Sequence, residues 1–161
     1  MASVFAQIVE GKLPCHKIYE NDSFLAFLDI NPIKLGHTLV IPKQEIDYIF
    51  DLDDTIYQGL VALAKPIAVA IKVALSCARV GVIVAGYEIP HAHVHLIPTD
   101  SMADFSFANA QRATDVQLAE VADKIRQQLW DTEMTSNDSS PKNTNVSKQI
   151  PMLSRPRRNR K

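Results

Sequence analysis

The sequence predicts an α+β domain with a mainly antiparallel sheet of about five short strands, one long helix and one shorter helix. Two observations lead to this fold class. Short runs rich in β-branched and aromatic residues recur between turn residues, as in a strand-turn-strand pattern. Two longer segments instead repeat their apolar residues every three to four positions, which is the helical period. No internal repeat is present.

The first elements lie in the N-terminal third. Ser3 can cap a short helix over Val4–Glu10, which Gly11 would end. Two strands are expected at His16–Tyr19 and Phe24–Leu28, on either side of a polar turn. The run 37–42 is β-rich and closes at a proline, which predicts a third strand.

The remaining elements are a long helix, two strands and a last helix. An aspartate at position 51, 53 or 54 would cap the long helix over residues 55–75, which contains Pro66. Strands are predicted over 79–85 and 91–98. Thr114 and Gln117 have the spacing of a capping box for the last helix. Its expected buried positions are Val116, Leu118, Val121, Ile125 and Leu129.

Composition divides the 161 residues into a body, 1–130, and a polar, basic tail, 131–161. The body has 10 Lys+Arg and 15 Asp+Glu, and the tail has 7 and 3. An acidic body is a poor binder of duplex nucleic acid. The tail is expected to be disordered because it has too little apolar surface to offset its ordering entropy. Its basic end, 155–161, is either a solvated tail or a weak contact for RNA or another polyanion.

The composition also bears on location. No apolar run is long and uncharged enough to predict a membrane span, and the N-terminus does not resemble a secretory signal. The two cysteines, Cys15 and Cys77, are far apart in the sequence and cannot build a disulfide framework. We therefore expect a cytoplasmic protein with no membrane partner.

One segment contains three of the five histidines, His91, His93 and His95, at a spacing of two. On a strand these rings would point to one face, about 6.5–7 Å apart. Three readings remain open: a metal site, a structural set bonded to backbone carbonyls, and a catalytic set. The catalytic reading is favoured because a neutral imidazole attacks phosphorus well when its other nitrogen donates to a fixed acceptor. Neighbouring imidazoles could neutralise the phosphate charge.

The histidine segment resembles the signature of the histidine triad (HIT) superfamily. Other segments follow the N-terminal half of that family in the same order, namely 5–14, 19–22, 24–32 and 36–43. The resemblance spans about residues 3–98 and is closest to the Hint-like nucleoside phosphoramidases. It implies a HIT-like fold, a homodimer, no required cofactor and a purine nucleotide ligand resembling adenosine monophosphate.

The resemblance also implies roles for individual residues. His93 matches the nucleophile, His91 and His95 match its flanking histidines, and His37 matches a fourth histidine that orients them. Asp29 matches an acceptor for ribose hydroxyls. Four residues match an apolar purine slot, although each could equally be core: Phe5, Ile8, Phe27 and Ile30. Glu88 stands where relatives bond the phosphate with serine, and Tyr87 stands in the place of a glutamine.

A departure from the family concerns zinc. Many relatives bind structural zinc through two cysteines and a histidine, and these places hold Ser3, Ala6 and Glu45 here. No metal is therefore predicted. The leading function is hydrolysis of a nucleoside 5′-phosphoramidate or acyl-nucleotide through a nucleotidyl-histidine. Two alternatives remain: a nucleotide-binding module with little turnover, and a metal protein that uses the triad as ligands.

Overall fold

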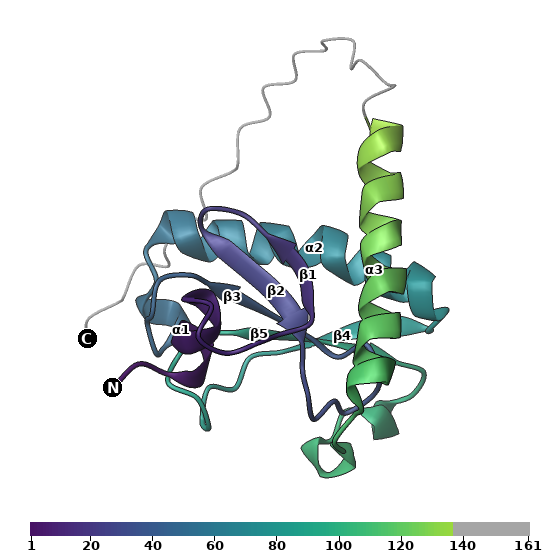
Figure 1. The fold of residues 1–161 in the computed structure, drawn as a ribbon, viewed down its shortest axis with the longest axis horizontal. Coiled ribbons are helices and arrows are strands. Elements are labelled where there is room, and N and C mark those ends of the chain that lie inside the picture. Colours follow the sequence, from purple (N-terminus) through teal and green to yellow (C-terminus); the bar gives the residue numbers. More distant parts are fainter. Residues whose placement is uncertain (137–161) are drawn as a thin grey trace, which may run out of the picture.

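The protein, described by a computed structural model over residues 1–136, has a five-stranded antiparallel sheet and three α-helices (Figure 1). The order of strands across the sheet is β1-β2-β3-β5-β4, which leaves β1 and β4 at the edges. This confirms the predicted fold class. The strands are β1 (Lys17–Glu20), β2 (Phe24–Leu28), β3 (Thr38–Pro42), β4 (Arg79–Ile83) and β5 (Val94–Thr99).

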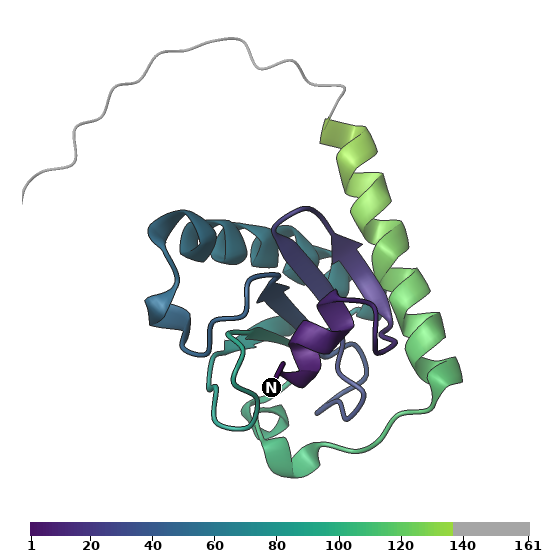
Figure 2. The ribbon, with the colours of Figure 1, turned by 60° about the vertical axis from the view of Figure 1, so that its left-hand side comes forward.

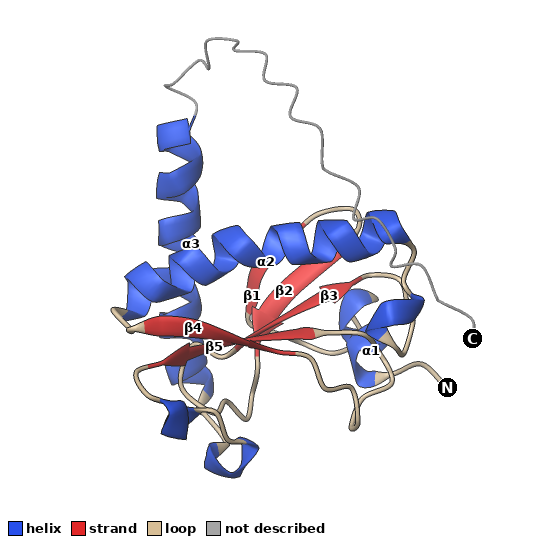
Figure 3. Ribbon diagram, turned by 180° about the vertical axis from the view of Figure 1, so that it is seen from behind, coloured by secondary structure: helices blue, strands red, loops and turns tan. Residues whose placement is uncertain are grey.

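The two faces of the sheet have different covers. Helices α2 (Asp54–Leu75) and α3 (Asp115–Ser136) pack on the face that carries Ala26, Val40 and Leu96. The short helix α1 (Val4–Val9) lies on the opposite face, where Phe5 joins the buried side chains of Phe27 and others. Figures 2 and 3 show α1 and α2 on opposite sides of the strands. Strand alternation explains the division, because successive side chains point to opposite faces.

Helix α2 begins directly after its N-cap residue, Asp53. The Asp53 carboxylate accepts a hydrogen bond from the Ile56 backbone N–H at 3.0 Å. The helix continues through Pro66 to Leu75. Its buried positions repeat every three or four residues: Leu60, Ala64, Ile67, Ala70 and Ile71. By length and composition alone α2 could cross a membrane, but its buried stripe is also what a core helix requires.

Helix α3 confirms the predicted capping box and corrects two details. Thr114 and Gln117 exchange the expected hydrogen bonds. Leu118, Val121 and Ile125 are buried as predicted, whereas Val116 is 68% exposed. Val116 lies two residues from Leu118, about 200° around the helix, and therefore faces solvent. The helix continues to Ser136, past the predicted end of the body at 130, and the rest of the predicted tail lies outside the described residues.

Strand β5 starts at Val94 rather than at the predicted residue 91. The backbone N–H of Ala92 donates to the Ile46 carbonyl at 2.6 Å, and that of His91 donates to the Ile89 carbonyl. These backbone N–H groups are therefore not bonded to a neighbouring strand, and the chain joins the sheet only from Val94. His91 and His93 therefore precede the strand, and only His95 lies within it. Ala92, Val94 and Leu96 pack in the core on the helical face, as the alternation predicted.

Candidate active site

Four histidines gather at the ends of β3 and β5, on the face that α1 covers. His37, His91, His93 and His95 are all at most 7% exposed. The His93 and His95 ring centroids are 4.7 Å apart, which is closer than the predicted 6.5–7 Å. The ring of His37 lies 5.1 Å from that of His95. The structure thus brings together the predicted triad and the predicted fourth histidine.

The hydrogen bond of His93 fixes which of its nitrogens is free. Its Nδ1 lies 2.7 Å from the His91 carbonyl oxygen, which can only accept, so Nδ1 carries the proton. In the neutral ring Nε2 then holds the lone pair. Burial lowers the pKa of His93, and this outweighs the bond to His91 and the nearby Glu88 charge, which both raise it. The ring is therefore neutral at pH 7, as a nucleophile must be.

His91 is held at both ring nitrogens. Its Nε2 donates to the Pro42 carbonyl at 2.8 Å, which leaves Nδ1 as an acceptor for the Ser3 hydroxyl at 3.1 Å. The Ser3 oxygen also accepts from the Ala6 N–H and so caps α1. The sequence predicted the cap but not the bond to the triad, which joins residues 88 positions apart. His91 thereby fixes the carbonyl that orients His93.

Replacing Ser3 with alanine should destabilise the protein by about 1–3 kcal/mol, because both the helix cap and the partner of His91 Nδ1 are lost. Urea unfolding would measure the change. Threonine at this position keeps a hydroxyl and serves as the control, which should lose much less. An alanine variant as stable as the parent protein would contradict the role given to this bond.

A second chain of hydrogen bonds fixes His37 and His95. The Ile33 backbone N–H donates to His37 Nδ1 at 3.2 Å, so the His37 proton is on Nε2. This Nε2–H donates to His95 Nδ1 at 2.9 Å. His95 therefore carries its proton on Nε2, from which it can donate to a ligand. Burial, with the neighbouring histidines, lowers the pKa of His37 to about 3 and that of His95 to about 4.

Asp29 lies beside this pair. Its carboxylate is 3.8 Å from His37 Nε2 and accepts a hydrogen bond from the Asn31 N–H. Because His37 is neutral at pH 7, the contact is not an ion pair. Burial is the main cause of the raised pKa of Asp29. The carboxylate is half-buried beside the histidines, where a ligand hydroxyl could reach it.

Ligand atoms of Asp29, His37 and His95 lie within 4.8 Å of one another, so a cation could in principle join them. A metal on His37 Nε2 would displace its proton to Nδ1, where the Ile33 N–H already donates. That displacement would break the bond and set two donors against each other. The donor set therefore does not favour a metal.

The four residues of the predicted purine slot are not equally placed. Phe5 and Phe27 pack edge to face with centroids 5.4 Å apart, and the Phe5 ring lies 5.2 Å from that of His93. Both are at most 5% exposed, as core packing alone would require. Ile8 is half-buried beside them, whereas Ile30 is 42% exposed and belongs to neither core cluster. Surface for a purine would therefore come mainly from Ile8 and Ile30.

Glu88 and Tyr87 are exposed in the loop before the triad. The Glu88 charge acts on both Asp29 and His93 and raises the pKa of each. The Glu88 carboxylate therefore adds negative potential at the His93 ring and at Asp29.

Comparison with known proteins identifies the family. The sequence model of the protein family described as the HIT domain matches residues 10–102, which are more than half of the chain. The chain belongs to the HIT family. An uncharacterised HIT-like protein from Borreliella burgdorferi is 36% identical over 116 residues, which are 68% of this chain and 84% of that protein.

Two relatives have names that state an activity. An adenosine 5′-monophosphoramidase from Schizosaccharomyces pombe is 36% identical over 61% of this chain and 74% of its own length. An adenylylsulfatase from Arabidopsis thaliana is 34% identical over 59% of this chain, but only 51% of its own length is matched. Among solved structures, a zinc-bound histidine triad protein from Mycobacterium smegmatis is 30% identical with a TM-score of 0.74, over 84% of this chain and 98% of the other.

The places where zinc was expected in HIT relatives do not fit a metal here. The Ser3 hydroxyl is bonded to His91, and Ala6 has no ligand atom. The Glu45 carboxylate accepts from the Ser3 backbone N–H at 2.6 Å, and this bond is the main cause of the lowered pKa of Glu45. Hydrogen bonds thus join the segments that zinc would otherwise link.

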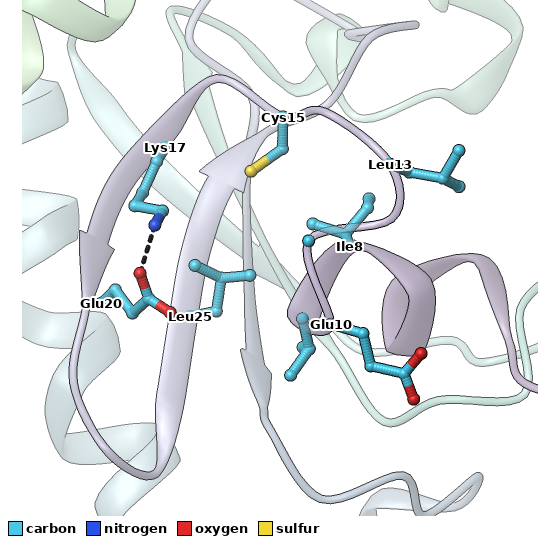
Figure 4. Close-up of a pocket in the computed structure, with 9 residues that line it drawn as sticks. Ile8, Glu10, Leu13, Cys15, Lys17, Glu20 and Leu25 are labelled. Atoms are coloured by element: carbon cyan, nitrogen blue, oxygen red, sulfur yellow. Dashed lines mark hydrogen bonds and ion pairs between the residues drawn. The ribbon is translucent and has the colours of Figure 1, made fainter.

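A cleft of about 400 Å³ lies apart from the histidines of this HIT protein, between α1 and the strands β1 and β2. Figure 4 shows Cys15 and Leu25 at its walls and the ion pair between Lys17 and Glu20 at one side. It shares only Ile8 with the predicted site residues. Burial raises the pKa of the Cys15 thiol and so makes it a poor nucleophile at pH 7.

The lowered histidine pKa values predict an acid-sensitive fold with a broad active pH range. The folded protein keeps His37, His93 and His95 neutral below 6.5, where the unfolded chain binds protons. The free energy of unfolding should therefore fall as pH drops below about 6.5, with the His37 and His95 contributions lost progressively towards pH 3–4. Turnover should not decline at 6.5 but only at lower pH. Urea unfolding and kcat/KM from pH 4 to 8 would test both. A half-maximal kcat/KM at or above pH 6.5 would contradict the prediction.

Proposed function

We propose that the protein hydrolyses purine nucleoside 5′-phosphoramidates or acyl-nucleotides at the α-phosphorus through a nucleotidyl intermediate on His93. The observation that carries the proposal is the hydrogen bond from His93 Nδ1–H to the His91 carbonyl. It leaves a neutral Nε2 with a free lone pair in a buried site, which is the state that attacks phosphorus.

The reaction would proceed in two steps. His93 Nε2 attacks, a phosphorus–nitrogen bond forms, and the leaving group departs with its bonding electron pair and takes a proton from solvent. The His91 carbonyl stabilises the resulting imidazolium through Nδ1–H. His95 Nε2–H donates to a phosphate oxygen or to the leaving group, and Asp29 accepts from ribose hydroxyls. Water then attacks phosphorus and loses a proton to solvent. The phosphorus–nitrogen bond breaks with its electron pair returning to Nε2, and the nucleoside monophosphate leaves.

The names of the yeast and plant relatives support a reaction at the phosphorus of an adenylyl group, with nitrogen or sulfate as the leaving group. The test is to mix the protein with adenosine 5′-phosphoramidate, quench in base within milliseconds and measure the intact mass. The expected species is the protein plus one adenylyl group. Turnover without any such adduct, at times when it should accumulate, would contradict the proposed intermediate.

A binding module with little turnover is the second candidate, and the exposed Glu88 favours it. A negative charge that reaches His93 opposes an anionic substrate. Measuring AMP affinity and turnover on one sample separates the two functions. Micromolar binding without hydrolysis would favour the module.

We also propose that two copies associate through α2 and the edge strand β4. Apolar side chains are exposed on both elements, at Val61, Val69 and Val73 of α2 and at Val82 of β4, and Val84 directly after β4 is exposed as well. A second copy would cover these side chains and pair the open edge of β4. A second copy on this surface also explains why α2 is apolar enough to resemble a membrane-spanning helix.

Replacing Val69, which is 49% exposed, with aspartate should weaken the dimer by at least about tenfold, because it buries an unpaired charge. Sedimentation equilibrium would measure the dissociation constant. Val116→Asp, on the exposed face of α3, is the matched control and should leave it unchanged. A monomeric parent protein would refute the dimer.

The two unpaired cysteines, Cys15 and Cys77, support a reducing, cytoplasmic location, which we propose on that ground alone.

A further inference from the structure

The segment after the triad, residues 100–113, is anchored to the sheet at Gly81. A Cβ on Gly81 would lie 2.0 Å from the Phe105 ring. The missing side chain therefore lets Phe105 pack directly on the backbone of β4. Gly81 pairs with Ile97, two residues after His95, so the anchor lies on the same face of the sheet as His95.

Further hydrogen bonds fix the course of this segment. Ser101 and Asp104 form a capping box around η2 (Met102–Asp104), and η3 (Phe107–Asn109) follows. The chain then runs beside the Asp29 loop, where Gln111 N–H donates to the Pro32 carbonyl and Ala113 N–H donates to the Ile30 carbonyl. Figure 2 shows the segment passing below the sheet before it rises into α3. The chain on either side of η3 is thus attached, before it to β4 through Phe105 and after it to the loop that follows Asp29.

This course places Phe107 at the edge of the histidine cluster. Its ring lies edge to face with that of His95, with centroids 5.3 Å apart, and the residue is 50% exposed. His95 bonds to His37, which lies beside Asp29. Phe107 is therefore on the side of the expected ribose acceptor, whereas Phe5 contacts His91 and His93.

We propose that Phe107 is a specificity-determining residue whose exposed ring forms a wall for the sugar of the bound nucleotide. Phe105 is a positioning residue that holds this wall on Gly81. The proposal rests on the proposed nucleotide ligand but not on turnover. The ribose carbons would pack against the apolar Phe107 ring, and the ribose hydroxyls would donate to the Asp29 carboxylate. Both the apolar and the polar parts of the sugar would then be satisfied.

The test measures the binding of AMP by calorimetry and of ribose 5-phosphate by NMR titration, so it does not depend on hydrolysis. Phe107→Ala should raise both dissociation constants by about tenfold, which is the value of burying half a phenylalanine ring. Phe107→Tyr should bind nearly as well as the parent protein. Met102→Ala, in the same segment with Met102 81% exposed, is the matched control. Phe105→Ala should weaken binding in the parent protein but not further in Phe107→Ala.

The outcomes separate this inference from the proposed function. Unchanged affinity for both ligands in Phe107→Ala would overturn the inference, and so would weaker binding of AMP alone, which would place the ring against the base. A parent protein that binds neither ligand would overturn both proposals. A parent protein that binds AMP without hydrolysing a phosphoramidate would refute only the enzymatic function, and the tenfold effect of Phe107→Ala would still support the wall.

Discussion

Replacing His93 with alanine should lower kcat for adenosine 5′-phosphoramidate by on the order of 10⁴-fold, because no other side chain in the site can form the covalent intermediate. His91 uses both ring nitrogens in hydrogen bonds, and the free nitrogen of His95 carries a proton. Neither can take over the attack without breaking a bond that holds it. AMP should still bind, because the other polar groups of the site remain.

The control for this variant is His16→Ala. His16 is the fifth histidine of the chain, and its ring Nε2 lies 3.4 Å from the Asp115 carboxylate. The His16→Ala variant should keep full activity. Steady-state rates and AMP calorimetry on both variants would give the result. If His93→Ala turned over substrate at the parent rate, the assignment of the nucleophile would be wrong.

The second large effect is expected at His37, which acts through His95. Replacement with leucine removes the donor that fixes the proton of His95 on Nε2 and leaves the Ile33 N–H without its acceptor. We expect kcat to fall by about 10²-fold, which is the scale of a misplaced proton donor. The unsatisfied N–H should also cost about 1–3 kcal/mol of stability.

Glutamine at position 37 separates the catalytic effect from the structural one. Its amide nitrogen lies near the place of His37 Nε2 and can donate to His95, so part of kcat should return. Nitrogen NMR of His95 would report its protonated nitrogen directly. If the leucine variant lost stability but kept both kcat and the Nε2–H tautomer, His37 would be only a packing residue.

Local patterns predicted much of this architecture. The caps formed by Ser3, Asp53 and Thr114 depend on residues three positions apart, so the sequence is sufficient to find them. The spacing of the histidines, with the order of the flanking segments, likewise indicated the family and the cluster.

Features that depend on distant contacts could not be predicted. The delayed start of β5 results from a hydrogen bond between Ala92 and Ile46. The proton positions of the histidines depend on carbonyl and amide groups of Pro42 and Ile33. The contact of Phe107 with His95 and the packing of Phe105 on Gly81 join segments that are distant in the sequence. None of these pairings leaves a periodic trace in the sequence.

The sheet separates two surfaces of the protein. It carries α2 on one face and the histidines on the other, so substitutions on one surface can be accepted independently of the other. Substitutions on the outer surface of α2 do not contact the histidine cluster, since layers of buried side chains lie between them. The surface of α2 could therefore change in evolution or by design while the histidine cluster keeps its geometry.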